Sequence, residues 1–180
     1  MTDGLSMELR HQFKKAERTI LRLSAQDRQT LAAICGEIRL AEAALNKNAA
    51  PLLHRCIESC AGLCCRNIRL TEIIGFYDFI YLLTTAGSLK GTMADCLRNE
   101  SLYSGDCIFL KNGKGPCIFP SDARPRLCII SFCFDVAPVK NHIRAVNSGF
   151  NRLSRFIRSK RLTAMAQRLA NVLLPKTGEN

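Results

Sequence analysis

Apolar residues recur every three or four positions near the start of the chain and predict two successive helices. In the N-terminal segment, Phe13, Ile20 and Leu21 lie on one side with polar residues such as Glu17 and Arg18 between them, a pattern typical of an amphipathic helix. A second helix is expected after Ser24, because its hydroxyl can accept a hydrogen bond from a backbone amide and Asp27 favours the positive end of a helix. The apolar stripe of this second helix consists of Leu31, Ile34, Cys35, Ile38, Ala41 and Leu45.

The sequence NKNAAP at residues 46–51 interrupts this stripe. Proline is favoured in the first turn of a helix and disfavoured inside one. We therefore expect the second helix to end here and a third helix to begin at Pro51 and lead to Cys56.

The middle of the chain predicts two further helices and a β-hairpin. The apolar stretch EIIGFYDFIYLLTT, residues 72–85, is expected to be helical, with Thr71 as its cap and Gly87 after its end. A shorter helix is expected in TMADCLRN, residues 92–99. The sequence CIFLKNGKGPCIF, residues 107–119, alternates and contains an Asn-Gly pair, which is the strongest hairpin signal in the chain.

The last part of the chain is a predicted basic helix from about Gly149 to Leu174. Its apolar side is formed by Leu153, Phe156, Ile157, Leu162, Met165, Leu169 and Val172. The remaining surface carries Arg152, Arg155, Arg158, Lys160, Arg161 and Arg168. These patterns together predict a mainly α fold: one small domain of helices with a short β-hairpin around a cysteine-ligated metal site, flanked by an N-terminal helical arm and a C-terminal basic helix.

Charge and cysteine content divide the 180 residues into three expected segments: a helical segment over 1–55, a cysteine-cluster metal-binding domain over 56–133 and a basic amphipathic tail over 134–180. The tail holds 9 Lys and Arg against 2 Asp and Glu, and so supplies most of the net charge of +11. Such a tail can contact an acidic protein, the phosphate backbone of a nucleic acid or an anionic membrane surface. The partner classes stay open at this point.

The start of the chain contains no apolar run of the length that a signal peptide needs. The most apolar stretch is too short to span a bilayer and contains Asp78. We therefore expect a cytoplasmic protein without a transmembrane segment, in which thiols stay reduced. In that compartment, regularly spaced cysteines are more often metal ligands or catalytic groups than disulfides.

Eight of the ten cysteines fall into two groups: Cys56, Cys60, Cys64 and Cys65, then Cys107, Cys117, Cys128 and Cys133. Cysteines four apart on a helix point the same way, and strand pairing in the hairpin would draw Cys107 and Cys117 together. The eight are thus predicted metal ligands, with disulfides as the competing interpretation. Cys35 and Cys96 lie beside apolar residues, and we interpret both as packing residues.

The spacing of these cysteines bears on the choice of metal. Structural zinc sites usually contain C-x2-C pairs, which this chain lacks. Adjacent residues such as Cys64 and Cys65 have difficulty binding one ion together, whereas a multi-iron cluster offers separate ligand positions. Apolar neighbours in CIFL and CIISFCF would also keep water from a cluster. An iron-sulfur cluster is therefore expected, with zinc as the alternative.

The order of CIESCAGLCC, NIRLTEII, GDCIFLKNGKGPCIF and ARPRLCIISFC resembles the YkgJ-type cysteine-cluster family, a zinc- or iron-chelating domain with a CxxCxxCC signature. The resemblance covers about residues 56–133 and implies that the eight cysteines above are the family's cluster cysteines. It also identifies Arg124 and Pro125 with the family's Arg-Pro step. Flagellin lysine methylases are similar in their cysteine arrangement, and that similarity implies an iron-sulfur cluster. This chain departs from the signature in having three residues between successive cysteines of the first group.

Arg124 is a candidate cofactor-binding residue, because a guanidinium can hydrogen-bond to sulfur and offset the negative charge of a thiolate site. A surface turn residue next to Pro125 is the competing interpretation. No catalytic residue is predicted, since His11, His54 and His142 are scattered and no nucleophile has an evident base. We therefore expect a metal-cluster protein acting in electron transfer, sensing or metal handling. A zinc-binding interaction module that contacts nucleic acid through its tail and a small cluster-dependent enzyme remain as alternatives.

Overall fold

The computed structural model describes residues 2–60, 65, 68–98, 106–111, 116–132 and 135–173. Within these ranges, the side chains of residues 2–6, 52–60, 168 and 170–173 lie outside the description. The described chain is mainly helical. In order, its helices are α1 Thr2–Leu21, α2 Ala25–Cys60, α3 Leu70–Ile73, α4 Phe76–Thr85, the 3-10 turn η2 Gly87–Leu89, α5 Lys90–Arg98, α6 Arg126–Ile130, the 3-10 turn η5 Ala137–Val139 and α7 Lys140–Leu173.

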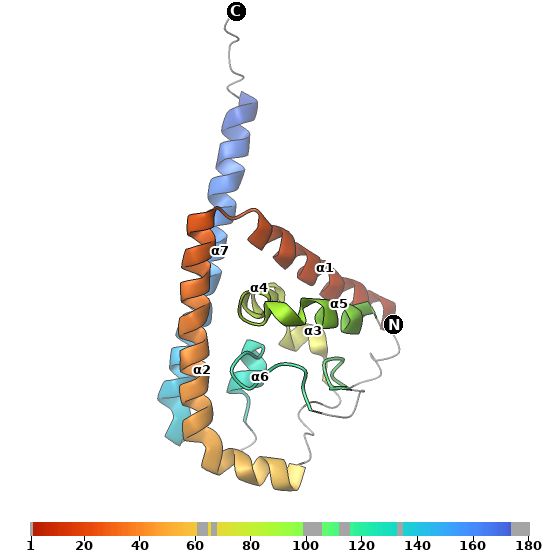
Figure 1. Ribbon diagram of the computed structural model, residues 1–180, viewed down its shortest axis with the longest axis vertical. Coiled ribbons are helices and arrows are strands. Elements are labelled where there is room, and N and C mark those ends of the chain that lie inside the picture. The colour runs from red at the N-terminus through yellow and green to blue at the C-terminus, as the bar shows by residue number, and fades with distance from the viewer. Residues whose placement is uncertain are drawn as a thin grey trace, which may run out of the picture.

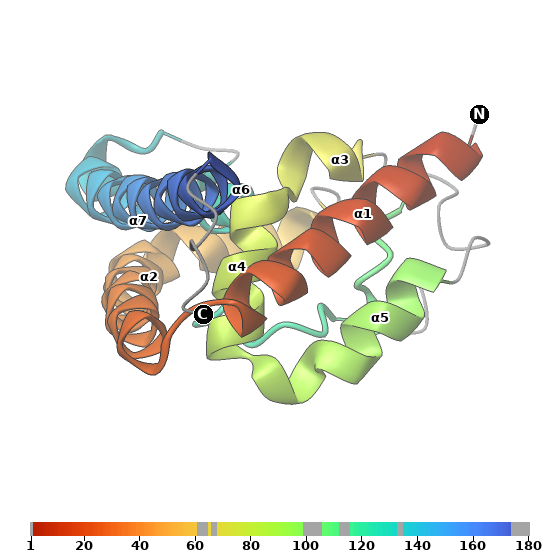
Figure 2. The ribbon, with the colours of Figure 1, turned by 90° about the horizontal axis from the view of Figure 1, so that it is seen from above.

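Two long helices, α2 and α7, form one side of the molecule and run in opposite directions (Figures 1 and 2). Helix α4 packs against both of them and also against α1, which lies across it (Figure 2). Edge-to-face ring contacts join α4 to its two sides: Phe79 to Phe13 at 5.4 Å and Tyr81 to Phe150 at 5.1 Å between ring centroids. The expected N-terminal arm is therefore part of the hydrophobic core.

The close approach of α2 and α7 depends on Gly149. A Cβ atom at this position would lie 2.6 Å from Cγ1 of Ile38, a separation that real Cβ atoms do not reach. Ile38 is completely buried, as are Leu153 and Ile157 on α7. Gly149 thus lets the two helix backbones pack directly against each other.

The predicted start of α2 is confirmed, and the predicted interruption is wrong. The backbone amide of Asp27 donates to the Ser24 hydroxyl at 3.0 Å, which is the expected cap. The helix then continues through Pro51 to Cys60 instead of ending near residue 46. Figure 1 shows the final part of α2 bending away from the rest and passing below α6. Proline inside a helix causes such kinks, because it removes a backbone donor and crowds the preceding turn.

The helix predicted over residues 72–85 is divided into α3 and α4, and Thr71 does not cap it. Helix α4 begins after Gly75, whose backbone amide donates to the Asp78 carboxylate at 3.0 Å. The short helix predicted over residues 92–99 is confirmed as α5, whereas α6 was not predicted.

The predicted β-hairpin is wrong, because the described residues contain no β-strand. A single antiparallel bridge joins Leu110 to Cys117. Its two hydrogen bonds run from the Ile118 amide to the Phe109 carbonyl at 2.8 Å and from the Lys111 amide to the Pro116 carbonyl at 3.0 Å. Cys107, Ile108, Phe109 and Leu110 are all buried. The Leu110 amide donates to the Cys107 carbonyl at 3.1 Å, so these four residues form a buried turn instead of a strand.

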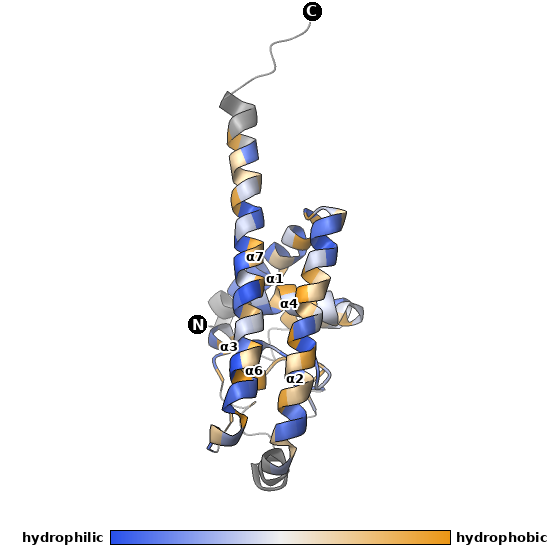
Figure 3. Ribbon diagram, turned by 90° about the vertical axis from the view of Figure 1, so that its left-hand side faces the viewer, coloured by the Kyte–Doolittle hydropathy of each residue, from blue (hydrophilic) through white to orange (hydrophobic). Residues whose placement is uncertain are grey.

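Helix α7 begins well before the predicted Gly149, and its last part extends beyond the other helices (Figure 3). Leu153 and Ile157 on its expected apolar side are buried, but Leu162, Met165 and Leu169 are exposed. No helix among the described residues combines the length and the apolar character needed to cross a bilayer.

Candidate metal centre

Four of the predicted ligand cysteines line one cavity of about 210 Å³: Cys65, Cys107, Cys117 and Cys128. They come from separate parts of the chain. Cys65 follows α2, Cys107 lies shortly before the isolated bridge, Cys117 is one of the two residues that form it, and Cys128 belongs to α6. The fold thus brings together cysteines from both sequence groups.

Backbone hydrogen bonds hold two of these segments in place. The amide of Cys107 donates to the carbonyl of Cys65 at 2.8 Å. The bridge between Leu110 and Cys117 then brings the chain back past the same cavity. The rest of the lining is mainly apolar and includes Ile73, Ile74, Phe109 and Phe119.

Burial raises the pKa of three thiols around the cavity, those of Cys107, Cys117 and Cys128, and so disfavours their thiolate forms when no cation is present. The pKa of Cys107 is raised to about 12: burial is the main cause, a backbone hydrogen bond with Phe109 acts in the opposite direction, and the nearby Cys117 thiol adds to the rise. Burial also raises the pKa of Cys117, and Arg124 acts in the opposite direction. A thiolate here needs a positive charge close by, because a buried anion is costly unless it is compensated.

Cys128 is exposed, yet its thiol pKa is raised as well. The cause is desolvation by the protein on the remaining sides of the thiol, followed by the thiols of Cys107 and Cys117. Cys128 therefore combines access from solvent with the same electrostatic environment as the buried cysteines.

Arg124 lies at the same cavity, as expected for a residue that would face a thiolate centre. Its Nε atom is buried and has no hydrogen-bond partner among the described residues. A buried donor without a partner is costly. Arg124 therefore combines a positive charge at the cavity with a buried donor that has no described partner.

A buried polar network holds the backbone of Arg124. The carboxylate of Glu42, on α2, accepts hydrogen bonds from the Arg124 amide at 3.2 Å and from the Tyr81 hydroxyl at 3.0 Å. Glu42 is completely buried, and desolvation raises its pKa to about 8. The Tyr81 hydroxyl also lies 3.3 Å from the Asp122 carbonyl. This network connects α2 and α4 to the loop that carries Arg124.

Asp78 positions α6 in a similar way. Its Oδ1 atom accepts from the Arg126 amide at 2.7 Å, and its Oδ2 atom accepts from the Gly75 amide. Burial raises the pKa of this carboxyl, and the two amides act against that shift. One carboxylate therefore joins the starts of α4 and α6, and so holds Cys128 relative to the core.

The other predicted ligands fall outside the described side chains. Cys64 and Cys133 lie outside the described residues, and Cys56 and Cys60 belong to α2 without described side chains. Within the part of the chain whose side chains are described, no group of three or more His, Cys, Asp or Glu residues is arranged to hold a metal ion. The six described cysteines are all free thiols.

The two cysteines interpreted as packing residues differ from each other. Cys35 is completely buried in the core, in agreement with the prediction. Cys96 on α5 is only partly buried, and it is close enough to Cys107 and Cys117 for their thiols to affect one another's pKa. Cys96 is therefore part of the thiol-rich region.

Glu42 and Asp78 are the site residues that sequence reasoning missed as such. Both carried a signal, because each is an acidic residue inside an apolar stretch: Glu42 follows Ala41 in the stripe of α2, and Asp78 lies between Tyr77 and Phe79. Acidic residues at such positions are rarely buried without partners.

Comparison of the chain with protein-family models, with curated proteins and with solved structures found no match.

Proposed function

We propose that this protein binds an iron-sulfur cluster through cysteine thiolates and acts in electron transfer, sensing or metal handling. The observation that carries the proposal is the convergence of Cys65, Cys107, Cys117 and Cys128 on one cavity together with Arg124. Core packing alone would not favour several thiols and a guanidinium nitrogen without a described partner around a shared space.

The chemistry of the cavity suits such a group. Thiolates are the usual ligands of iron-sulfur clusters, and the reduction potential depends on hydrogen bonds to sulfur and on solvent exposure. Arg124 would supply a positive charge and a donor, and the apolar wall formed by Ile74, Phe109 and Phe119 would exclude water. The bound group would in turn stabilise the thiolate forms that burial disfavours.

The proposed ligand set also includes Cys56, Cys60, Cys64 and Cys133, as the resemblance to the YkgJ-type family implies. The kink in α2 favours this extension, because it directs the segment with Cys56 and Cys60 below α6 (Figure 1). Zinc is the competing occupant, since it takes the same thiolate ligands. Thiolate ligation requires reduced cysteines, which agrees with a cytoplasmic location.

The basic tail is proposed to bind an acidic partner. The expected classes of partner are an acidic protein, a nucleic acid and a membrane surface. This contact is separate from the cysteine cavity. We assign no catalytic residue, so the proposed role is that of a binding protein rather than an enzyme.

Anaerobic purification followed by absorption spectroscopy and by iron, sulfide and zinc analysis tests the proposal. We expect a brown protein that contains iron and acid-labile sulfide. Cys117→Ser should lose most of the metal, whereas Cys35→Ser, which changes a buried cysteine outside the cavity, should retain it. A colourless protein that contains zinc would identify zinc, and not an iron-sulfur cluster, as the bound group. A protein without metal would refute both the iron-sulfur and the zinc assignment.

A further inference from the structure

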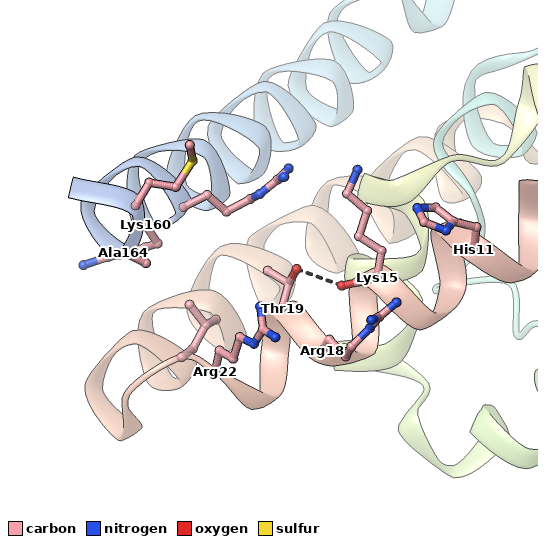
Figure 4. A pocket seen from close by; sticks show the side chains of 10 residues that line it. His11, Lys15, Arg18, Thr19, Arg22, Lys160 and Ala164 are labelled. Atoms are coloured by element: carbon pink, nitrogen blue, oxygen red, sulfur yellow. Dashed lines mark hydrogen bonds between the residues drawn. The ribbon is translucent and has the colours of Figure 1, made fainter. Parts of the chain in front are cut away.

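A basic cleft of about 360 Å³ lies between α1 and the second half of α7. Figure 4 shows side chains on the two sides of this space, with Lys15 and Arg18 on α1, Arg22 just after it and Lys160 on α7. We use the name basic cleft for its basic lining residues, which are His11, Lys15, Arg18, Arg22, Lys160 and Arg161. No acidic residue is among the described residues that line it.

Most of this charge is not neutralised within the described part of the chain. Lys160 forms an ion pair of 2.7 Å with Asp27. None of the other ion pairs between described residues involves Lys15, Arg18, Arg22 or Arg161. Like charges on facing helices repel each other, so the cleft favours an anion that several cations can contact at once.

Two of the cations are held over one aromatic ring. Nζ of Lys15 lies 5.3 Å from the centroid of Phe76, and the guanidinium carbon of Arg161 lies 5.6 Å from the same centroid. Cation-π contacts of this kind hold a charged group without neutralising it. Phe76 therefore keeps one cation from each helix in position while leaving both charges available.

We propose that the basic cleft binds the phosphate backbone of a single-stranded nucleic acid. Lys15 and Arg18 on α1, and Arg22 in the turn that follows it, recur at spacings of three and four residues, so they form a row of charge along one side of the cleft. A row of cations suits a polymer with repeating phosphates better than a compact anion.

The shape of the cleft favours a single strand over a duplex or a membrane. Its volume is that of a small-molecule pocket, so it admits part of one extended strand and excludes a duplex. A bilayer presents a flat surface, whereas the cations here line a concave space between two helices. Helix α7 also carries exposed apolar residues, including Met165 at the cleft. The test must therefore distinguish binding to a nucleic acid from binding to a membrane.

Binding through phosphate contacts should be insensitive to base sequence and strongly dependent on salt. The ring of Phe76 is nearly buried and is covered by Lys15 and Arg161, so it offers no free face for base stacking. Because Lys15, Arg18, Arg22 and Arg161 can each neutralise one phosphate, the slope of log K against log salt concentration should be about −3 for the cleft alone.

The test uses the anaerobically purified full chain and a fluorescent thymidine oligonucleotide of about twelve nucleotides, followed by anisotropy. Arg18→Glu with Arg22→Glu should weaken binding at least about tenfold at low salt and reduce the salt slope. Lys47→Glu with Lys140→Glu makes the same change in net charge at exposed positions outside the cleft, and should weaken binding less than about threefold. Circular dichroism checks that each variant keeps its helices.

Equal losses in both double variants would overturn the proposal, because the net charge rather than the cleft would then be responsible. Tripolyphosphate can be added as a competitor at the same total phosphate concentration as the oligonucleotide. If it displaces the oligonucleotide with equal affinity, the cleft would be assigned to a small anion instead. Binding to vesicles of anionic phospholipid without binding to the oligonucleotide would assign it to a membrane. The metal content of the variants should not change, so this test is independent of the cysteine cavity.

Discussion

The backbone amide of Cys107 donates a 2.8 Å hydrogen bond to the backbone carbonyl of Cys65. This bond joins the end of the first cysteine group to the beginning of the second, and the side chains of both residues line the same cavity. One cysteine of the first group and three of the second therefore share one cavity, although a long stretch of helices separates the two groups in the sequence.

Arg124 should raise the reduction potential of a cluster held in this cavity. Its positive charge favours the more negative, reduced form of the cluster. Arg124→Gln removes that charge and should make the midpoint potential more negative by about 60 mV, which is a tenfold change for a one-electron step. A redox titration followed by absorbance measures the shift.

Two control variants accompany this titration. Arg124→Lys keeps the positive charge, so its midpoint potential should stay close to that of the unchanged protein. Arg39→Gln removes an exposed arginine that pairs with Asp122 outside the cavity, and it should have little effect. An unchanged potential in Arg124→Gln would show that Arg124 does not interact with the bound group.

Glu42 should make the protein less stable as pH rises from about 5 to about 8. Its folded pKa of about 8 lies above the ordinary value of 4.5, so across this interval the folded protein holds a proton that the unfolded chain releases. The stabilisation is complete below the lower value and is lost as pH rises through the upper one. Thermal unfolding between pH 5 and pH 8, as set by these values, measures the effect.

Glu42→Gln is the matching control, because glutamine is neutral and keeps a carbonyl oxygen for the Arg124 amide. The variant should show a flatter dependence of melting temperature on pH than the unchanged protein. Asp78, whose pKa is also raised by burial, would account for the remaining dependence. Identical pH profiles for the two proteins would contradict the assignment of this proton to Glu42.

Gly149 should be essential for the packing of α2 against α7, whereas Gly36 should not. Gly149→Ala places a Cβ atom against Ile38, and we expect a loss of about 1–3 kcal/mol in the free energy of unfolding. Gly36 lies inside α2, where an added methyl group would meet no atom of another element within 4 Å, so Gly36→Ala should stabilise the helix by about 0.5–1 kcal/mol. Denaturant unfolding measures both changes. If the two substitutions changed the free energy of unfolding by the same amount in the same direction, the close contact between α2 and α7 would be contradicted.

Periodicity predicted much of the helical structure because the buried faces of α1, α2 and α7 are continuous in the sequence. Local rules failed where tertiary contacts decided the outcome. Pro51 was predicted to begin a third helix after a break, but it lies inside α2. The Asn-Gly signal predicted a hairpin, but Cys107 to Leu110 form a buried turn.

The cysteines that line the candidate site were predictable from the sequence, but the hydrogen bonds that hold the site in place were not. Cysteine spacing identified Cys65, Cys107, Cys117 and Cys128, which the fold places around one cavity. The contact of Glu42 with the Arg124 amide joins residues that are far apart in the chain, and no spacing rule reports such a pair. The basic cleft was missed for the same reason, because much of its charge comes from α1 rather than from the tail.

X-ray absorption at the edge of the bound metal tests the central claim most directly, since it reports the atoms that contact the metal. For the anaerobically purified protein, we predict an iron spectrum with a sulfur shell at about 2.3 Å, the length of a typical metal-thiolate bond, and a second shell of neighbouring iron. A first shell of nitrogen or oxygen would contradict thiolate ligation, and so would protein that retains no metal.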